Sequence, residues 1–280
     1  MATTIANLGS PAPTGNLLIV DGLNVAFRWK HQGVTDFKYD YIRTIESLAK
    51  SYKAGTIIVC ADGGSTYRKE IYPEYKANRK ERFADQTEQE AKEFEMFMAE
   101  FSDTLTLIRQ KYPVFHFRGV EADDIAAYIT KEIEYDECWL ISSDKDWDLL
   151  INDKVSRFST VTRKETTVHN WDEHYDFEIE DFISYKCLTG DKGDNVPGVP
   201  GVGPKRAVQL MEQYGTVFDI YDACPIDGRY KYIQSVNENA EQLLTNFELM
   251  DLLTYCDVAI GKENTEVIDR TLEEILNDRN

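Results

Sequence analysis

The sequence predicts an α/β fold in which a largely parallel central sheet is flanked by helices. Three short apolar runs support this prediction, and each ends in a carboxylate: LLIVD at Asp21, TIIVCAD at Asp62 and CWLISSD at Asp144. These runs of Ile, Val and Leu do not alternate with polar residues, which indicates strands that are buried on both faces. Segments with helical periodicity separate the runs, as in βαβ units.

The elements around these strands follow from local spacing. Between the first two strands, Tyr41, Ile45 and Ala49 recur at helical intervals, and Gly55 follows as a helix stop. A third strand is expected at VFHF, from Val114, with a helix at EADDIAAYITKE after it. Farther along the chain, VSRFST and ETTVHN alternate like a hairpin at the edge of the sheet.

One segment, from Ser65 to about Tyr112, is too long for an ordinary connection in an α/β unit, which runs about 2 to 6 residues. Its first half, YRKEIYPEYKANRKER, is rich in basic residues, and its second half is acidic. We therefore expect a functional insertion. Its basic half interleaves aromatic and cationic side chains, which suit a nucleobase stacked beside a phosphate: Tyr72, Tyr75, Lys76 and Arg79. A solvated basic face is the alternative interpretation.

The glycine-rich segment GVPGVGPKR indicates a hairpin between two helices. It is not a P-loop, because Pro204 separates the last glycine from Lys205 and because Arg206 stands where Ser or Thr would be needed. Gly201 and Gly203 would let backbone N–H groups approach a phosphate, and the next helix would begin at Pro204 with its positive end forward. A plain tight turn is the alternative.

The chain is thus expected to have three parts: a disordered leader at 1–16, an α/β core at 17–175 with the insertion at about 65–98, and a helical region at 176–280 with the hairpin at about 183–215.

Composition excludes several classes of protein. The net charge of −19 rules out a simple basic coat for nucleic acid. The 5 cysteines are scattered singly, so neither a disulfide framework nor a zinc ribbon is indicated. No signal peptide and no apolar run long enough to span a bilayer can be recognised. We expect a soluble, cytoplasmic protein and find nothing that indicates an obligate dimer.

Carboxylates are the main candidates for chemistry. Because the carboxyl ends of parallel strands meet at one edge of a sheet, the strand ends should gather there together with the acidic helix start and the turn TGDKGDN. The expected set is Asp21, Asp62, Glu121, Asp123, Asp124, Asp144, Asp146, Asp191 and Asp194. Any one of them could instead be a helix cap. Together they would repel one another unless they bound a divalent metal, and oxygen-only ligation favours Mg²⁺ or Mn²⁺ over Zn²⁺.

These motifs, taken in order, resemble the 5′-nuclease or flap endonuclease family, which includes the nuclease domain of bacterial DNA polymerase I and the stand-alone bacteriophage exonucleases. The resemblance spans about residues 17–222 and rests on LLIVDGLNVAFR, PEYKANR, GVEADDIAAYI, LISSDKDWDLL and GDKGDNVPGVPGVGPKRA. No polymerase module follows, so the stand-alone bacteriophage type is the expected likeness.

The resemblance implies a PIN-like fold and a two-metal, structure-specific nuclease that cuts 5′ flaps and erodes duplex DNA from 5′ ends, in replication or repair of a bacteriophage genome in the host cytoplasm. It implies a first metal cluster of Asp21, Asp62, Glu121 and Asp123, with Asp124 beside them, and a second of Asp144, Asp146, Asp191 and Asp194.

The insertion would be the helical arch of the family. The resemblance implies that Lys76 and Arg79 act at the scissile phosphate and that Tyr75 lies against a displaced base. Further DNA contacts would come from Lys69, Lys80, Gly201, Gly203, Lys205 and Arg206. The hairpin of the family can also hold K⁺, and the enzyme is expected to be a monomer.

Three alternatives remain open from the residues alone. They are a ribonuclease that acts on RNA–DNA hybrids, a non-catalytic binder of branched DNA, and an acidic inhibitor or scaffold. An inhibitor would not need the hairpin or the basic segment. A binder would not need so many carboxylates, which repel DNA in the absence of metal.

Overall fold

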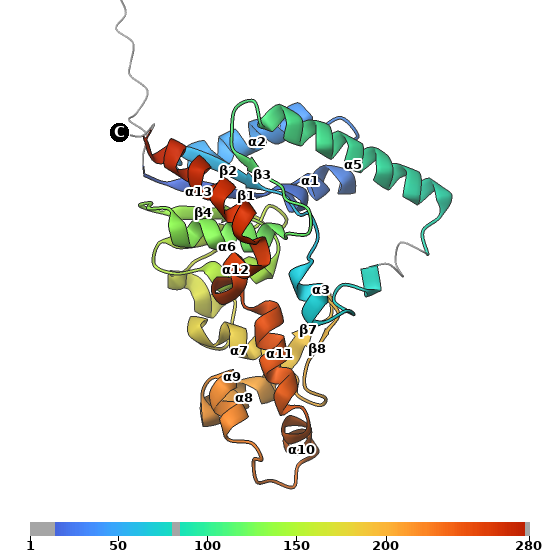
Figure 1. Ribbon diagram of the computed structural model, residues 1–280, viewed down its shortest axis with the longest axis vertical. Helices are drawn as coiled ribbons and strands as arrows, with labels where there is room; N and C mark the ends of the chain where they lie inside the picture. Colours follow the sequence, from blue (N-terminus) through green and yellow to red (C-terminus); the bar gives the residue numbers. More distant parts are fainter. Residues whose placement is uncertain (1–14, 80–84, 278–280) are drawn as a thin grey trace, which may run out of the picture.

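The computed structural model describes residues 15–79 and 85–277, and a six-stranded sheet lies between helices in the upper part of the view in Figure 1. The strand order is β3-β2-β1-β4-β5-β6, and every pairing is parallel except that of β5 with β6. The bounds are β1 (Leu17–Asp21), β2 (Thr56–Cys60), β3 (Val114–Phe115), β4 (Cys138–Ile141), β5 (Val155–Phe158) and β6 (Glu165–Thr166). The predicted α/β class and the predicted edge hairpin are confirmed.

Both faces of the sheet are covered by helices, which explains the unbroken apolar runs. Leu17 and Ile19 of β1 pack on one face, mainly against α6 (Ala122–Glu132), and Leu18 and Val20 pack on the other. That second face is covered by α1 (Gly22–His31), α2 (Lys38–Ser51) and part of α5 (Glu88–Ile108). Every residue of β1 is buried, so no position in this strand faces solvent.

In the described residues, the predicted insertion contains α3 (Tyr67–Ile71), a turn, and α5. Residues 80–84, which include Lys80, lie outside the described residues. Thr87 caps α5 by accepting from the N–H of Glu90, whose side chain bonds back to Thr87. The helix begins exposed and becomes buried only from Phe97 onward. Figure 1 shows it reaching away from the sheet, whereas α3 lies near β7 (Gly190–Asp191) and β8 (Val196–Pro197).

Two helices flank the glycine-rich segment. They are α7 (Phe182–Thr189) and α8 (Pro204–Tyr214), and between them β7 pairs with β8 in a short antiparallel ladder that the sequence did not predict. Gly190 makes this ladder possible, because its φ is +71° and a Cβ there would lie 2.2 Å from the backbone nitrogen of Gly198. The neighbouring elements are η1 (Lys145–Leu150), η2 (Val168–Glu173), η3 (Ile179–Asp181), α9 (Val217–Asp222), α10 (Lys231–Glu238) and α11 (Ala240–Met250).

The last two helices leave this helical region and return to the sheet. In α12 (Leu252–Ile260) and α13 (Lys262–Asn277), apolar side chains such as Cys256 and Ile268 join the core around α6. The residues after 175 were expected to form one helical region. Instead, α7 to α11 pack around a core of their own, and α12 and α13 pack on the sheet. No helix in the described ranges is both long enough and apolar enough to cross a bilayer.

Candidate functional site

The structure brings an acidic side chain to one edge of the sheet from each of three neighbouring strands. Asp21 is the last residue of β1, Asp62 lies just beyond β2, and Asp144 lies just beyond β4 and caps η1. β1 pairs in parallel with both of its neighbours, so these three ends point the same way. With Glu121 and Asp123 from the start of α6, they form a group that we call the acidic rim.

Asp21 is buried at the centre of the rim. Its carboxylate accepts hydrogen bonds from Oγ of Ser142 at 2.6 Å and from the N–H of Asn24 at 3.2 Å. Burial is the main reason that its pKa rises to about 7, and the charges of Asp144 and Asp62 add to the effect. Ionised Asp21 is therefore costly in the metal-free protein.

The first turn of α6 supplies carboxylates with different surroundings. Asp123 accepts from Nε1 of buried Trp147 at 2.6 Å, and burial together with the charge of Asp144 holds its pKa well above the usual range. Asp124 instead bonds Arg68 through both oxygens, at 2.6 and 2.8 Å. The structure therefore separates Asp124, which is buried against a guanidinium, from the rim.

Glu121 receives donors from three residues of one short segment. Nη1 of Arg68 lies 2.8 Å away, the hydroxyl of Tyr75 lies 3.2 Å away, and Nζ of Lys76 is in contact. Burial alone would raise the pKa of Glu121, but Lys76 and Arg68 lower it to about 2. Tyr75 is only 4% exposed, so in this conformation its ring cannot stack on a displaced base as predicted.

Asp194 connects the same segment to the turn before the hairpin. The hydroxyl of Tyr75 donates to it at 2.8 Å, and Nη2 of Arg79 lies 2.9 Å from its other oxygen. Lys76 also pairs with Asp194 at 3.4 Å. The side chain of Arg79 is 48% exposed, whereas that of Lys76 is 13% exposed, so Lys76 is the more firmly held of the two cations.

Asp146 and Asp191 share one buried lysine. Nζ of Lys186, on α7, contacts Asp146 and lies 3.2 Å from Asp191. Burial raises the pKa of Asp146 to about 6 even with Lys186 beside it. For Asp191 the same lysine outweighs burial, and the pKa is lowered. Lys186 thus joins the start of η1 to the turn before the hairpin.

The carboxylates fall into two groups by the charges around them. Some contact Lys or Arg, and others make no ion pair with any described residue: Asp21, Asp62, Asp123 and Asp144. Within the described ranges, no three acidic, histidine or cysteine side chains are close enough together to hold a metal ion. The chemistry of the second group nevertheless fits a hard divalent cation, because it offers oxygen donors and negative charge that no ion pair with a described residue neutralises.

The hairpin lies apart from the rim and presents basic side chains to solvent. Lys205 is exposed in the first turn of α8, which begins at Pro204 after Gly203. Arg206 is also exposed, but its guanidinium donates to the carbonyl of Gly201 and lies 4.7 Å from the ring centroid of Tyr232. Lys205 is therefore the freer of the two cations. Lys69, on α3, is exposed as well.

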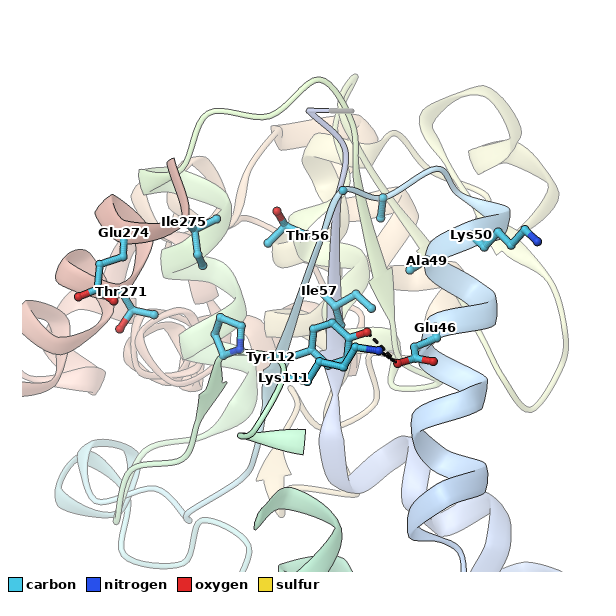
Figure 2. Close-up of a pocket in the computed structure, with 13 residues that line it drawn as sticks. Glu46, Ala49, Lys50, Thr56, Ile57, Lys111, Tyr112, Thr271, Glu274 and Ile275 are labelled. Carbon is cyan, nitrogen blue, oxygen red and sulfur yellow. Dashed lines mark hydrogen bonds and ion pairs between the residues drawn. The ribbon is translucent and has the colours of Figure 1, made fainter. Parts of the chain in front are cut away.

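A cavity of about 740 Å³ lies at the far ends of the strands, away from the rim (Figure 2). Its lining includes Thr56 at the start of β2 and Thr271 on α13. Lys111 and Tyr112 both bond Glu46 beside it. None of the predicted site residues lines this cavity, so it is not a candidate for the chemistry of the rim.

Several side chains that hold the rim or the carboxylates next to it were not singled out from the sequence. They are Arg68, Ser142, Trp147 and Lys186. Lys186 had a weak signal, because it is the one cation in the apolar run FISYKCL. Ser142 and Trp147 lie in LISSDKDWDLL, which drew attention only for its aspartates. Nothing local distinguished Arg68 from the other basic residues around it.

Two family models together match most of the chain. One, described as the N-terminal resolvase-like domain of 5′-3′ exonuclease, matches residues 16–176, and the other, described as the C-terminal SAM fold of 5′-3′ exonuclease, matches residues 177–272. The chain belongs to the 5′-3′ exonuclease family. This membership confirms the predicted resemblance, the fold class and the assignment as a nuclease.

Two individual relatives support the assignment to this family. The flap endonuclease of Escherichia phage T5 is 47% identical over 266 residues, which cover 93% of this chain and 91% of that protein. DNA polymerase I of Thermus aquaticus is 32% identical over 216 residues, which cover 73% of this chain but only 25% of the polymerase. This 5′-3′ exonuclease is thus similar to most of the phage protein but to only a quarter of the polymerase.

Two solved structures of the T5 protein are similar to this chain throughout. A pseudo-enzyme-product complex of the T5 D15 flap endonuclease with DNA and metal ions has a TM-score of 0.89 and 46% identity, over 93% of this chain and 98% of that one. A T5 5′-exonuclease with bound divalent zinc also has a TM-score of 0.89 and 46% identity, over 95% of this chain and 100% of that one.

Proposed function

We propose that this chain is a divalent-metal-dependent nuclease that hydrolyses phosphodiesters in 5′-flapped DNA and at 5′ ends of duplex DNA. The observation that carries the proposal is the acidic rim, where Asp21, Asp62, Asp123 and Asp144 gather without ion pairs beside Lys76 and Arg79. Such a rim would repel a DNA backbone unless cations lay between them. The T5 relative, a flap endonuclease with structures that contain DNA and metal ions, supports this substrate and the need for metal.

The unpaired carboxylates are the first choice as metal ligands. Glu121, Asp146, Asp191 and Asp194 would complete a set for two ions, once their lysine and arginine partners shift. Mg²⁺ or Mn²⁺ is proposed on the oxygen donors, although a T5 relative is known with zinc. Bound ions would lower the pKa of the attacking water and stabilise the attacking and leaving oxygens. Asp124, with both oxygens on Arg68, is proposed to position Arg68 instead.

The basic side chains at the rim have separate proposed roles. Lys76 and Arg79 would offset the negative charge that develops on the phosphate during hydrolysis. The hydroxyl of Tyr75 bridges Glu121 and Asp194, so Tyr75 would hold these two carboxylates in place. Lys69 and Lys80 would contact the DNA backbone outside the reaction centre.

The hairpin is proposed to grip the duplex without reading its sequence. Lys205 and the backbone around Gly201 and Gly203 face solvent beside a shallow pocket of about 450 Å³. Phosphate contacts of this kind position DNA and carry no sequence information. The same proposal includes a K⁺ ion in this loop and a monomeric enzyme. It also includes action in the cytoplasm of the host cell of a bacteriophage.

Replacing Lys205 by Ala is expected to weaken duplex binding for all sequences alike. The salt dependence of affinity should flatten by about one unit of slope for each phosphate that the protein no longer neutralises. Arg206→Ala should flatten it less, because Arg206 is engaged with Gly201 and Tyr232. Fluorescence anisotropy at several salt concentrations measures both slopes. An unchanged slope for Lys205→Ala would mean that the hairpin is only a turn.

The proposed activity is tested with a 5′-flap DNA, an RNA of the same structure and an RNA–DNA hybrid. Cleavage of the flap DNA should require Mg²⁺ or Mn²⁺, stop in chelator and return when metal is restored. Preferred cleavage of the hybrid would favour the ribonuclease alternative. Binding without cleavage under every metal condition would favour a non-catalytic binder of branched DNA.

A further inference from the structure

The basic segment, residues 74–79, is docked on the acidic turn, residues 191–195, by side-chain contacts with Asp194 and by hydrogen bonds to backbone atoms. The N–H of Lys76 donates to the carbonyl of Asp194 at 2.8 Å. Nδ2 of Asn195 donates to the carbonyl of Glu74 at 2.7 Å, and Nδ2 of Asn78 donates to the carbonyl of Lys192 at 2.9 Å. These bonds join two stretches of chain that are more than a hundred residues apart.

Few apolar contacts assist this docking. In the basic segment only Tyr75 belongs to a hydrophobic core, whereas Glu74 and Arg79 are exposed. The position of Lys76 therefore depends on polar contacts around it. Because exposed hydrogen bonds open easily where apolar packing is sparse, the loss of one of them should make the basic segment open more often.

The backbone at the contact is left-handed on both sides, which is common for Asn but rare for Lys. Lys76 has a φ of +56° and Asn195 has a φ of +59°, a region that non-glycine residues seldom occupy. Such a conformation persists when surrounding contacts offset its cost, and it is frequent at functional sites. At Lys76 the bond from its N–H to Asp194 is one such contact, and its side chain reaches Glu121 and Asp194 from there.

We propose that Asn195 and Asn78 are positioning residues that hold the basic segment on the acidic turn and thereby place Nζ of Lys76 at the rim. The acidic turn continues through β8 into the hairpin, so the same docking ties the position of Lys76 to the element that grips the duplex. This inference rests on the proposed function, in which Lys76 acts on the phosphate.

The test uses Asn195→Gly, because glycine tolerates a positive φ and the substitution removes only the amide that bonds Glu74. The single-turnover cleavage rate at saturating enzyme and metal is expected to fall by about tenfold, with affinity for flap DNA changed by less than about threefold. Asn237→Ala is the matched control. It also deletes an amide that bonds a distant backbone, that of Ile226, and it should leave the rate unchanged.

A double-mutant cycle separates positioning from a general loss of structure. In a Lys76→Ala background, Asn195→Gly should lower the rate by less than about twofold, because its effect acts through Lys76. An equal loss in both backgrounds, or no loss in the parent enzyme, would overturn the inference.

Hydrogen exchange tests the docking without reference to catalysis. The amide of Lys76 should exchange at least about tenfold faster in Asn195→Gly, because a bond that holds its segment to Asp194 and its neighbours is gone. Unchanged exchange would overturn the docking whatever Lys76 does. Faster exchange, together with a normal rate for Lys76→Ala, would support the docking and refute the catalytic role given to Lys76.

Discussion

Asp21→Asn is expected to lower the rate of flap cleavage by about a thousandfold, or ~4 kcal/mol, because it removes a charged oxygen donor from the centre of the metal site. The fold should be retained, since the amide oxygen can still accept from the N–H of Asn24 and the amide nitrogen can donate to Oγ of Ser142. Single-turnover cleavage at saturating Mg²⁺ measures the effect. Asp144→Asn should behave similarly, because Asp144 belongs to the same unpaired group of carboxylates.

The same substitution should stabilise the metal-free protein. The pKa of Asp21 is raised from 3.8 to about 7 in the folded state, so wild-type stability is lost as pH rises from about 4 to about 7. At ~1.4 kcal/mol for each pKa unit, the loss reaches at most about 4 kcal/mol. In chelator, Asp21→Asn and the wild type should therefore have nearly the same free energy of unfolding in urea at pH 4. The variant should become increasingly more stable than the wild type as the pH approaches 7.

Asp251→Asn provides the matched control. Asp251 is buried to the same 7% exposure, and it caps α12 by accepting from the N–H of Thr254 at 2.9 Å. Asn is as good a helix cap as Asp, so neither rate nor stability should change much. Full activity of both Asp21→Asn and Asp144→Asn would refute the metal assignment at the rim.

Lys76→Ala is expected to cut flap DNA about a hundredfold more slowly at saturating enzyme, which corresponds to ~3 kcal/mol. Its equilibrium affinity, measured in Ca²⁺, should fall only a few-fold. The reason is that an ammonium aimed at the reacting phosphate acts mainly in the transition state, whereas duplex affinity depends on the hairpin. Glu121 keeps Arg68 and Tyr75 as partners in this variant, so the rim should not collapse.

Lys69→Ala provides the contrast on the same stretch of chain. Lys69 is exposed and makes no ion pair with any described residue, so its loss should weaken binding and leave the saturated rate unchanged. If Lys76→Ala instead loses affinity and keeps a normal saturated rate, the basic segment is a docking surface and the catalytic role of Lys76 is wrong.

Much of the fold could be predicted because its signals are local. The apolar runs that end at Asp21, Asp62 and Asp144 indicate buried parallel strands, and parallel pairing alone brings their carboxyl ends to one edge. The glycines and Pro204 likewise indicate a hairpin before a helix. The family resemblance rests on these same short motifs, and the two family models agree with it.

The partners of the carboxylates were decided by the tertiary structure. Arg68 meets Glu121 from 53 positions away, and Lys186 meets Asp146 from 40 positions away. Tyr75 was expected to lie against a displaced base, but packing buries it against Glu121 and Asp194. Periodicity and turn residues show which side of an element is buried, but not which distant side chain meets it there. That depends on how the sheet, the insertion and the helical region pack together, and so the charge balance of the rim was set only in the folded chain.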